Sequence, residues 1–207
     1  MTPFEQRMSR GGGAAIEEAS RFFMKQGPVW ESLRRIASKL EDLKIPYAVA
    51  GGMALVAHGY ERTTVDVDVL VSADSLKAVH QALEGLGYVP PFAGSKQLRD
   101  VQTSVRIEFL VTGQYPGDGK PKPVAFPDPA DVAVEISGIK YLGLVTLIEL
   151  KLASGISNPG RVKDLGDVQE LIRILKLPRE FGGKLNAYVR GKFEELHEGV
   201  ERDQSSD

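Results

Sequence analysis

Two aspartates one residue apart interrupt an apolar run at residues 65–71, "VDVDVLV". A short run of β-branched residues predicts a strand, although strand interiors disfavour aspartate. Because side chains at i and i+2 point to the same side of a strand, Asp66 and Asp68 share one face, and the neighbouring valines share the other. The valine face suits a core. The chain must therefore fold with both carboxylates on the side facing away from that core.

Two carboxylates held side by side repel each other, so the pair costs stability unless a cation or a proton offsets it. The natural cation is Mg²⁺, which takes oxygen ligands, with Mn²⁺ as an alternative. A third acid, Glu108, lies in the expected strand "VRIEFLV". If this strand pairs beside the first, Glu108 joins the aspartates in a site for two metal ions, which would stabilise an in-line phosphoryl displacement. Taken alone, a D-x-D on a strand is as readily a solvated pair.

A glycine pair, Gly51-Gly52, separates an expected strand at 47–50 from a short expected helix at 53–58. Glycine permits positive φ and lets a phosphate approach the backbone closely. A helix N-terminus offers free N–H groups to that phosphate. The pair is therefore a candidate triphosphate-binding turn, and a plain turn is the alternative interpretation.

The order of expected elements predicts an α/β (α+β) fold, a small mixed sheet flanked by helices, with a C-terminal helical lobe. The expected parts are an N-terminal tail and helix at 1–27, a core at 28–143, a helical lobe at 144–200 and a disordered tail at 201–207. Within the core we expect helices at 30–43 and 75–86, strands at 65–71 and 105–112, and a hairpin of 132–136 with 139–141. The proline-rich segment 114–130 is expected to be a loop or a flap beside a site.

The composition excludes several classes of protein. The 207 residues carry a formal net charge of −2 and no cysteine, which rules out a disulfide framework and thiolate metal sites. No apolar run reaches the roughly 20 residues of a membrane span, and the N-terminus lacks the apolar core of a signal peptide. We expect a soluble, cytoplasmic protein without a membrane partner.

Taken together, Gly51, Gly52, Asp66, Asp68 and Glu108 match a known pattern. The chain resembles the nucleotidyltransferase superfamily with the DNA polymerase β-like fold, which carries a Gly-Gly or Gly-Ser pair, then D-x-D, then a third acid on a later strand. The fuller string "AGGMALVAHGYERTTVDVDVLV" is similar to the AbiEii/AbiGii-type toxins of abortive-infection and toxin–antitoxin systems. The positions that also match that branch are His58-Gly59, Arg62, Thr64, Lys151, Arg161, Lys163, Asp164 and Asp167.

The resemblance, which covers about residues 45 to 175, implies a Mg²⁺-dependent enzyme that transfers NMP from an NTP to an acceptor hydroxyl. The acceptor would be RNA such as tRNA, or a protein, and a cognate antitoxin protein would be a partner. Asp66, Asp68 and Glu108 would be catalytic and metal-binding. The implied nucleotide-binding residues are Gly51, Gly52, Arg62, Thr64, Lys151, Arg161, Lys163 and Asp164. The second position of the pair is Gly52 rather than serine, so no hydroxyl is available there.

Two other functions stay open. One is a non-catalytic nucleotide- or partner-binding module on the same fold. The other is an enzyme that modifies a small molecule such as an antibiotic. Three acids that repel one another favour catalysis over binding alone, because a module that only binds need not keep them.

Several residues have a structural alternative. Lys151, among leucines, either contacts phosphate or reaches past them to water. Arg62 either binds phosphate or pairs with the aspartates. Asp164 and Asp167 fit the first turn of a helix, where the helix dipole stabilises them, and this is favoured for Asp167. His58 is expected to be structural.

Charge is uneven along the chain. Residues 139–192 hold ten Lys or Arg against five Asp or Glu, a net charge of +5. A basic lobe beside an acidic site could hold an RNA acceptor, and a solvated helical surface is the alternative.

Overall fold

The structure, a computed structural model, describes residues 13–204, with side chains from residue 16 onward. Most of the expected N-terminal tail (1–12) and residues 205–207 lie outside the described residues. In chain order the elements are α2 (Gly13–Phe23), α3 (Pro28–Asp42), β1 (Ala48–Val49), α4 (Gly51–Ala57), β2 (Asp66–Val71), α5 (Ala73–Leu83), β3 (Tyr88–Val89), β4 (Gln97–Asp100), β5 (Arg106–Val111), α6 (Pro129–Val132), β6 (Ala133–Ile136), β7 (Ile139–Leu142), α7 (Leu144–Ser157), η1 (Pro159–Arg161), α8 (Val162–Leu175), η2 (Arg179–Lys184) and α9 (Ala187–Gln204).

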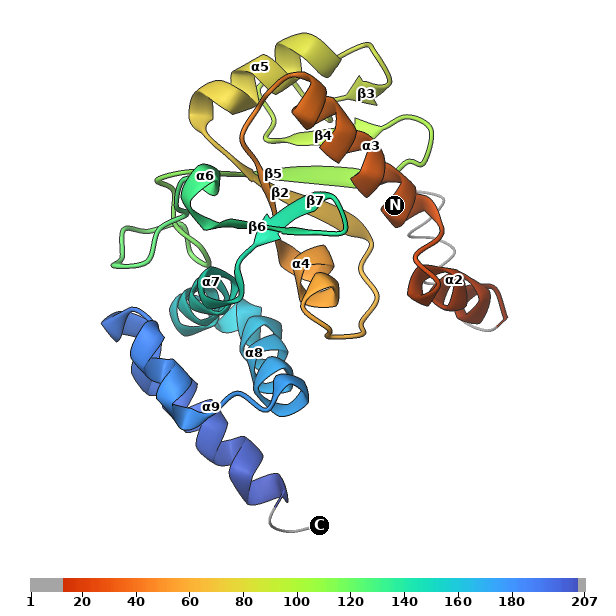
Figure 1. The fold of residues 1–207 in the computed structure, drawn as a ribbon. Helices are drawn as coiled ribbons and strands as arrows, with labels where there is room; N and C mark the ends of the chain where they lie inside the picture. Colours follow the sequence, from red (N-terminus) through yellow and green to blue (C-terminus); the bar gives the residue numbers. More distant parts are fainter. Residues whose placement is uncertain (1–12, 205–207) are drawn as a thin grey trace.

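The strands form a seven-stranded mixed sheet in the order β3-β4-β5-β2-β1-β7-β6 (Figure 1). β2 pairs parallel with β5, and the two-residue β1 pairs parallel with β7; the other neighbours are antiparallel. This confirms the predicted α/β class with a mixed sheet.

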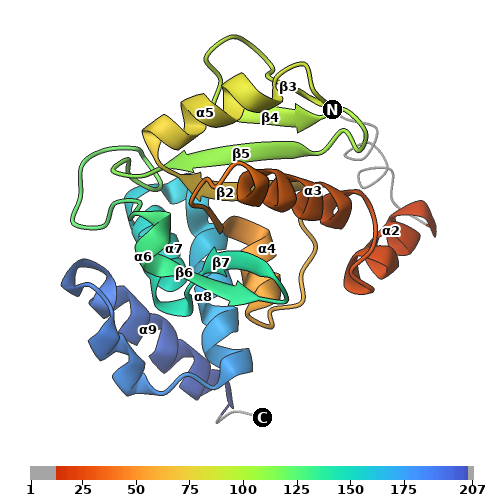
Figure 2. The ribbon, with the colours of Figure 1, turned by 45° about the horizontal axis from the view of Figure 1, so that its top comes forward.

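One face of the sheet packs against helices. Val67, Val69 and Ile107 are fully buried there, as the alternation of β2 and β5 requires. Helix α3 packs on β2 and β7 and α5 on β5, and Figure 2 shows both helices beside the sheet. Burying this apolar face leaves the alternate residues of β2 and β5 to line the other side.

The C-terminal helices α7, α8 and α9 pack against one another below the sheet in the view of Figure 1. The expected lobe is therefore helical, but α9 continues through 201–204, where the sequence predicts a disordered tail. Among residues 13–204, none of the helices combines the length and apolarity that a membrane crossing needs.

Three local predictions differ from the structure. The glycine pair is the first turn of α4, not a separate turn before it. The helix expected at 75–86 begins earlier, at Ala73, because the Ser72 side chain caps its start. It also ends earlier, at Leu83. The edge strand β3 and its neighbour β4, which lies between β3 and β5, are not predicted. The hairpin β6–β7 is confirmed, with Ser137 and Gly138 both at positive φ (53° and 78°), as a tight two-residue turn requires.

Candidate active site

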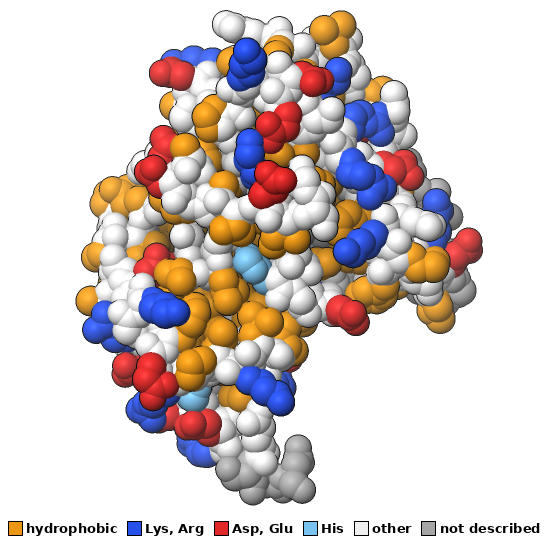
Figure 3. Space-filling model, in the orientation of Figure 1, with side chains coloured by type: hydrophobic (Ala, Val, Ile, Leu, Met, Phe, Trp, Pro, Cys, Tyr) orange, Lys and Arg blue, Asp and Glu red, His pale blue; other side chains and the backbone are white. Residues whose placement is uncertain are grey.

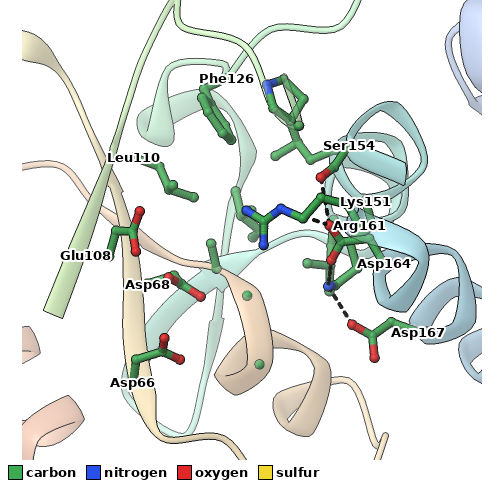
Figure 4. Close-up of a pocket in the computed structure, with 18 of the residues that line it drawn as sticks. Asp66, Asp68, Glu108, Leu110, Phe126, Lys151, Ser154, Arg161, Asp164 and Asp167 are labelled. Atoms are coloured by element: carbon green, nitrogen blue, oxygen red, sulfur yellow. Dashed lines mark hydrogen bonds and ion pairs between the residues drawn. The ribbon is translucent and has the colours of Figure 1, made fainter. Parts of the chain in front are cut away.

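The three acids meet on one face of the paired strands β2 and β5. In the parallel register, Asp66 lies opposite Arg106 and Asp68 lies opposite Glu108. The expected pairing of the two strands is therefore found, and it puts Glu108 on the same face as the aspartates, while the predicted metal site stays a prediction. Figure 4 shows the three carboxylates along these strands, facing α7 and α8 across a pocket.

Asp66 differs from its two neighbours because its oxygens already have partners. Thr64 Oγ1 donates to Oδ1 at 2.9 Å, and Arg106 Nη2 donates to Oδ2 at 2.6 Å. Within residues 13–204, no hydrogen bond or ion pair is found for the carboxylates of Asp68 and Glu108. The face thus holds one neutralised acid and two unpaired ones.

Asp68 is the acid most affected by its surroundings. Burial, followed by the negative charges of Asp66 and Glu108, raises the pKa of its carboxyl from 3.8 to about 7. The positive charges of Lys151 and Arg106 act in the opposite direction and offset only part of this shift. The cause is the one expected for like charges held together away from bulk water.

The carboxylate oxygens of Asp68 and Glu108 are suitable ligands for a hard cation. Mg²⁺ binds through one or two carboxylates and completes its shell with water and substrate phosphates. Within the described part of the chain, no group of three or more His, Cys, Asp or Glu side chains lies close enough together to hold a metal ion in the present arrangement. The side chain of Asp66 is turned to Arg106 instead.

The glycine pair is required by close packing. A Cβ atom on Gly51 would lie 1.7 Å from Asp68 Oδ2, and one on Gly52 would lie 2.7 Å from Thr64 Cβ and Oγ1. Gly51 also has a φ of +56°, which disfavours other residues. The start of α4 therefore packs directly against the acid-bearing strand.

The opposite wall carries a buried ion-pair network. Lys151 Nζ donates to Asp164 Oδ1 at 2.9 Å and to Asp167 Oδ2 at 2.7 Å. Ser154 Oγ also donates to Asp164. The Lys151 residue is only 8% exposed, so the interpretation in which it reaches past the leucines to water is wrong. Asp167 is likewise buried and paired, and it lies in the second turn of α8, so the favoured interpretation of Asp167 as a first-turn residue near the helix dipole is wrong; Asp164 is the acidic residue of that first turn.

Arg62 joins this network and does not pair with the aspartates of β2. Its Nη1 donates to both oxygens of Asp167, at 2.6 and 2.8 Å. The pair joins the loop that precedes β2 to helix α8. His58 is structural as expected, since its Nε2 lies 2.7 Å from the carbonyl oxygen of Leu142.

A pocket of about 450 Å³ lies between the two walls. All eleven predicted site residues line it: Gly51, Gly52, Arg62, Thr64, Asp66, Asp68, Glu108, Lys151, Arg161, Lys163 and Asp164. Residues as far apart as 51 and 164 are thus brought together, while their chemical roles stay predictions. Arg161 has a side chain 60% exposed and only a long contact, 3.9 Å, to Asp164.

The proline-rich segment closes one side of the pocket as a fixed wall. Lys122 Nζ donates to the carbonyl of Pro116, to Asp118 and to Ser157 Oγ at the end of α7. Gly117 packs so closely on α7 that a Cβ atom there would lie 2.7 Å from the carbonyl oxygen of Ser154. Phe126 lines the same end of the pocket (Figure 4).

The excess of positive charge counted over residues 139–192 almost disappears when the count is extended to the end of α9. Residues 139–204 hold eleven Lys or Arg against ten Asp or Glu. Arg179 pairs with Glu198 of α9 and Arg173 with Asp203. Figure 3 shows blue and red side chains interspersed over the C-terminal helices on this face. Of the basic residues of this lobe, Lys151, Arg161 and Lys163 line the pocket, and Lys151 is paired with two carboxylates.

Sequence reasoning missed Arg106 as a site residue. The signal that could have found it is the parallel register: once Asp68 is placed opposite Glu108, Arg106 must lie opposite Asp66. Ser154 was missed as well. It lies three residues, about one helical turn, after Lys151, and this spacing could have indicated that both side chains lie on the same face of the helix.

No protein-family model matches the sequence, and no curated protein matches it. Among solved structures, ANT(2'')-Ia, an antibiotic-resistance factor, is similar over 84% of this chain and 91% of its own, with 13% identity and a TM-score of 0.49. A candidate nucleotidyltransferase from H. pylori is similar over 85% and 95%, with 15% identity and a TM-score of 0.46. The lincosamide antibiotic adenylyltransferase LnuA is similar over 70% and 96%, with 19% identity and a TM-score of 0.47. At these TM-scores the likenesses carry no functional argument.

Proposed function

We propose that the protein is a nucleotidyltransferase, which transfers NMP from an NTP to an acceptor hydroxyl. The observation that carries this proposal is the register of β2 and β5. It lines Asp66, Asp68 and Glu108 along one face, at a pocket whose opposite side presents Arg161 and Lys163. Carboxylates facing cations across a pocket suit a reaction in which charge on phosphate oxygens must be held and neutralised.

A divalent cation, Mg²⁺ or Mn²⁺, bound at Asp68 and Glu108 would neutralise phosphate charge and orient the reacting oxygens. Glu108 accepts the proton of the acceptor hydroxyl as its oxygen attacks the α-phosphate. The bond from the α-phosphate to pyrophosphate then breaks, and pyrophosphate leaves with the electron pair. Arg161 and Lys163 hold the phosphates on the opposite side.

In this proposal Lys151 does not bind phosphate directly. Its ammonium group is held between two carboxylates, so its charge is already compensated. It fixes α8 and thereby the position of Arg161 and Lys163. The glycine pair places the start of α4 against Asp68 and leaves room there for the triphosphate.

The acceptor class is open between RNA, a protein hydroxyl and a small molecule. The resemblance to toxins of two-gene systems favours RNA such as tRNA, with a cognate antitoxin as partner. The balanced charge of the lobe, eleven basic against ten acidic residues, removes the electrostatic argument for a long RNA contact there. An RNA acceptor would therefore bind mainly at the pocket.

The decisive experiment is incubation of the full chain with each α-labelled NTP and Mg²⁺ or Mn²⁺. Separate reactions would contain total RNA, no acceptor, or small hydroxyl compounds such as aminoglycosides. Label should appear in one acceptor class and be lost with Asp68→Asn. Tight NTP binding without label in any class would instead support the non-catalytic module.

A further inference from the structure

Arg106 is built into the acidic face. It lies directly opposite Asp66 in the β2–β5 register, and its Nη2 is 2.6 Å from Asp66 Oδ2. Thr64 Oγ1 donates to the other oxygen of Asp66 at 2.9 Å. Both oxygens of Asp66 therefore accept hydrogen bonds from the chain itself.

The position of Arg106 is fixed by the sheet. Arg106 is paired on both sides, with Asp66 of β2 and with Arg99 of β4. The Asp66 side chain is 21% exposed, and Arg106 Nε is buried without a hydrogen-bond partner within the described residues. The Arg106 side chain is itself 37% exposed, but its planar guanidinium loses less conformational freedom per hydrogen bond than a flexible ammonium group does.

The charges on this face balance one divalent cation. With all three acids ionised, as cation binding requires, Asp66, Asp68 and Glu108 contribute three negative charges and Arg106 contributes one positive charge, which leaves −2. A single divalent cation at the unpaired acids, Asp68 and Glu108, neutralises the face. A second cation at Asp66 would have to displace a guanidinium at hydrogen-bond distance.

We propose that Arg106 takes the place of a second divalent cation in the nucleotide-free protein, so that one cation binds, at Asp68 and Glu108, while Arg106 stays on Asp66. This rests on the proposed function for the identity of the site. Arg106 is then a positioning residue: it neutralises Asp66 and keeps that carboxylate away from the cation.

The test is a titration of the metal-free full chain with Mn²⁺ alone, followed by calorimetry and by electron paramagnetic resonance. The wild type should bind one Mn²⁺ per chain. Asp68→Asn should weaken binding by about tenfold or more, as loss of a metal-site group does, whereas Asp66→Asn should change it by less. Arg106→Met should free Asp66 and allow a second Mn²⁺ to bind.

Arg99→Met is the matched control, because Arg99 is the neighbour of Arg106 on β4 but donates to the carbonyl of Ser104, not to Asp66. It should leave the stoichiometry at one. Two Mn²⁺ ions on the wild type, none at all, or equal losses with Asp66→Asn and Asp68→Asn would overturn the proposal. The last comparison decides the question even if Arg106→Met fails to fold.

The stoichiometry is independent of catalysis. One bound Mn²⁺ without transfer to any acceptor would refute the proposed function and leave the role of Arg106 standing. Transfer by a protein that binds two Mn²⁺ would do the reverse.

Discussion

Gly51 and Asp68 are in such close contact that a single added methyl group at Gly51 would lie 1.7 Å from the Asp68 Oδ2 atom. Gly51 belongs to the first turn of α4 and Asp68 to the middle of β2. The backbone of the helix start and this acid of the site therefore set each other's position.

Replacing Gly51 with alanine should displace Asp68 and strain the backbone, which has a φ of +56° there. We expect a loss of about 1–3 kcal/mol in the free energy of unfolding, measured by urea melts. Gly166→Ala is the control, because Gly166 lies inside α8 with no atom within 4 Å of an added Cβ. It should gain about 0.5–1 kcal/mol. Equal effects of the two substitutions would contradict the packing argument.

Replacing Lys151 with methionine should remove the cation nearest to the half-buried Asp164 and leave the buried Asp167 paired with Arg62 alone. Breaking a buried ion pair from one side costs about 3–5 kcal/mol, so the midpoint of urea unfolding should fall sharply. Lys192→Met removes a more exposed pair with Glu195 on α9 and should change stability by less than about 1 kcal/mol. A Lys151→Met protein as stable as the wild type would show that the network does not hold α8.

The stability of the metal-free protein should fall as the pH rises from about 4 to about 7. The pKa of Asp68 is raised from 3.8 to about 7 in the folded protein, so the folded state binds more protons than the unfolded state between these values. Stability falls with pH wherever the folded state holds more protons. Urea melts at several pH values, in a chelator, measure this slope, and Asp68→Asn should flatten it. An unchanged slope in the variant would assign the effect to another group.

Nucleotide binding should depend on the two cations at the start of α8. Arg161→Ala and Lys163→Ala should each weaken NTP binding about tenfold, since each removes a charged contact worth about 1.4 kcal/mol. The matched control is Arg173→Ala, on the same helix but paired with Glu170 and Asp203. Calorimetry with a non-hydrolysable NTP measures all three. Similar losses in all three variants would indicate a general charge effect.

Patterns confined to one strand or one turn were predicted well from the sequence. The alternation in β2 and β5 fixed which residues face the pocket, because side-chain direction in a strand has a period of two. The hairpin at Ser137-Gly138 was predicted from local turn chemistry. In contrast, β4 carries polar residues, "QLRD", and pairs on both sides only through tertiary contacts, so its pattern gave no signal.

The partners of charged side chains were predicted poorly. The sequence predicts phosphate or the aspartates of β2 as the partner of Arg62, whereas Arg62 binds Asp167, 105 residues away. For Lys151 the sequence predicts water or phosphate as the partner, whereas its ammonium group lies between two carboxylates of the next helix. Such pairings depend on how helices pack, which a sequence pattern within one helix does not specify.

The sheet is joined across its middle by β1, a strand of only two residues. β1 shares one register pair with β7, Val49 with Tyr141, whereas β2 and β5 share six. We therefore expect amide protons of the β6–β7 hairpin to exchange with solvent faster than those of β2 and β5, through a local opening that leaves the acid-bearing strands paired. The molecule would then loosen at its hairpin edge without changing the spacing of its carboxylates.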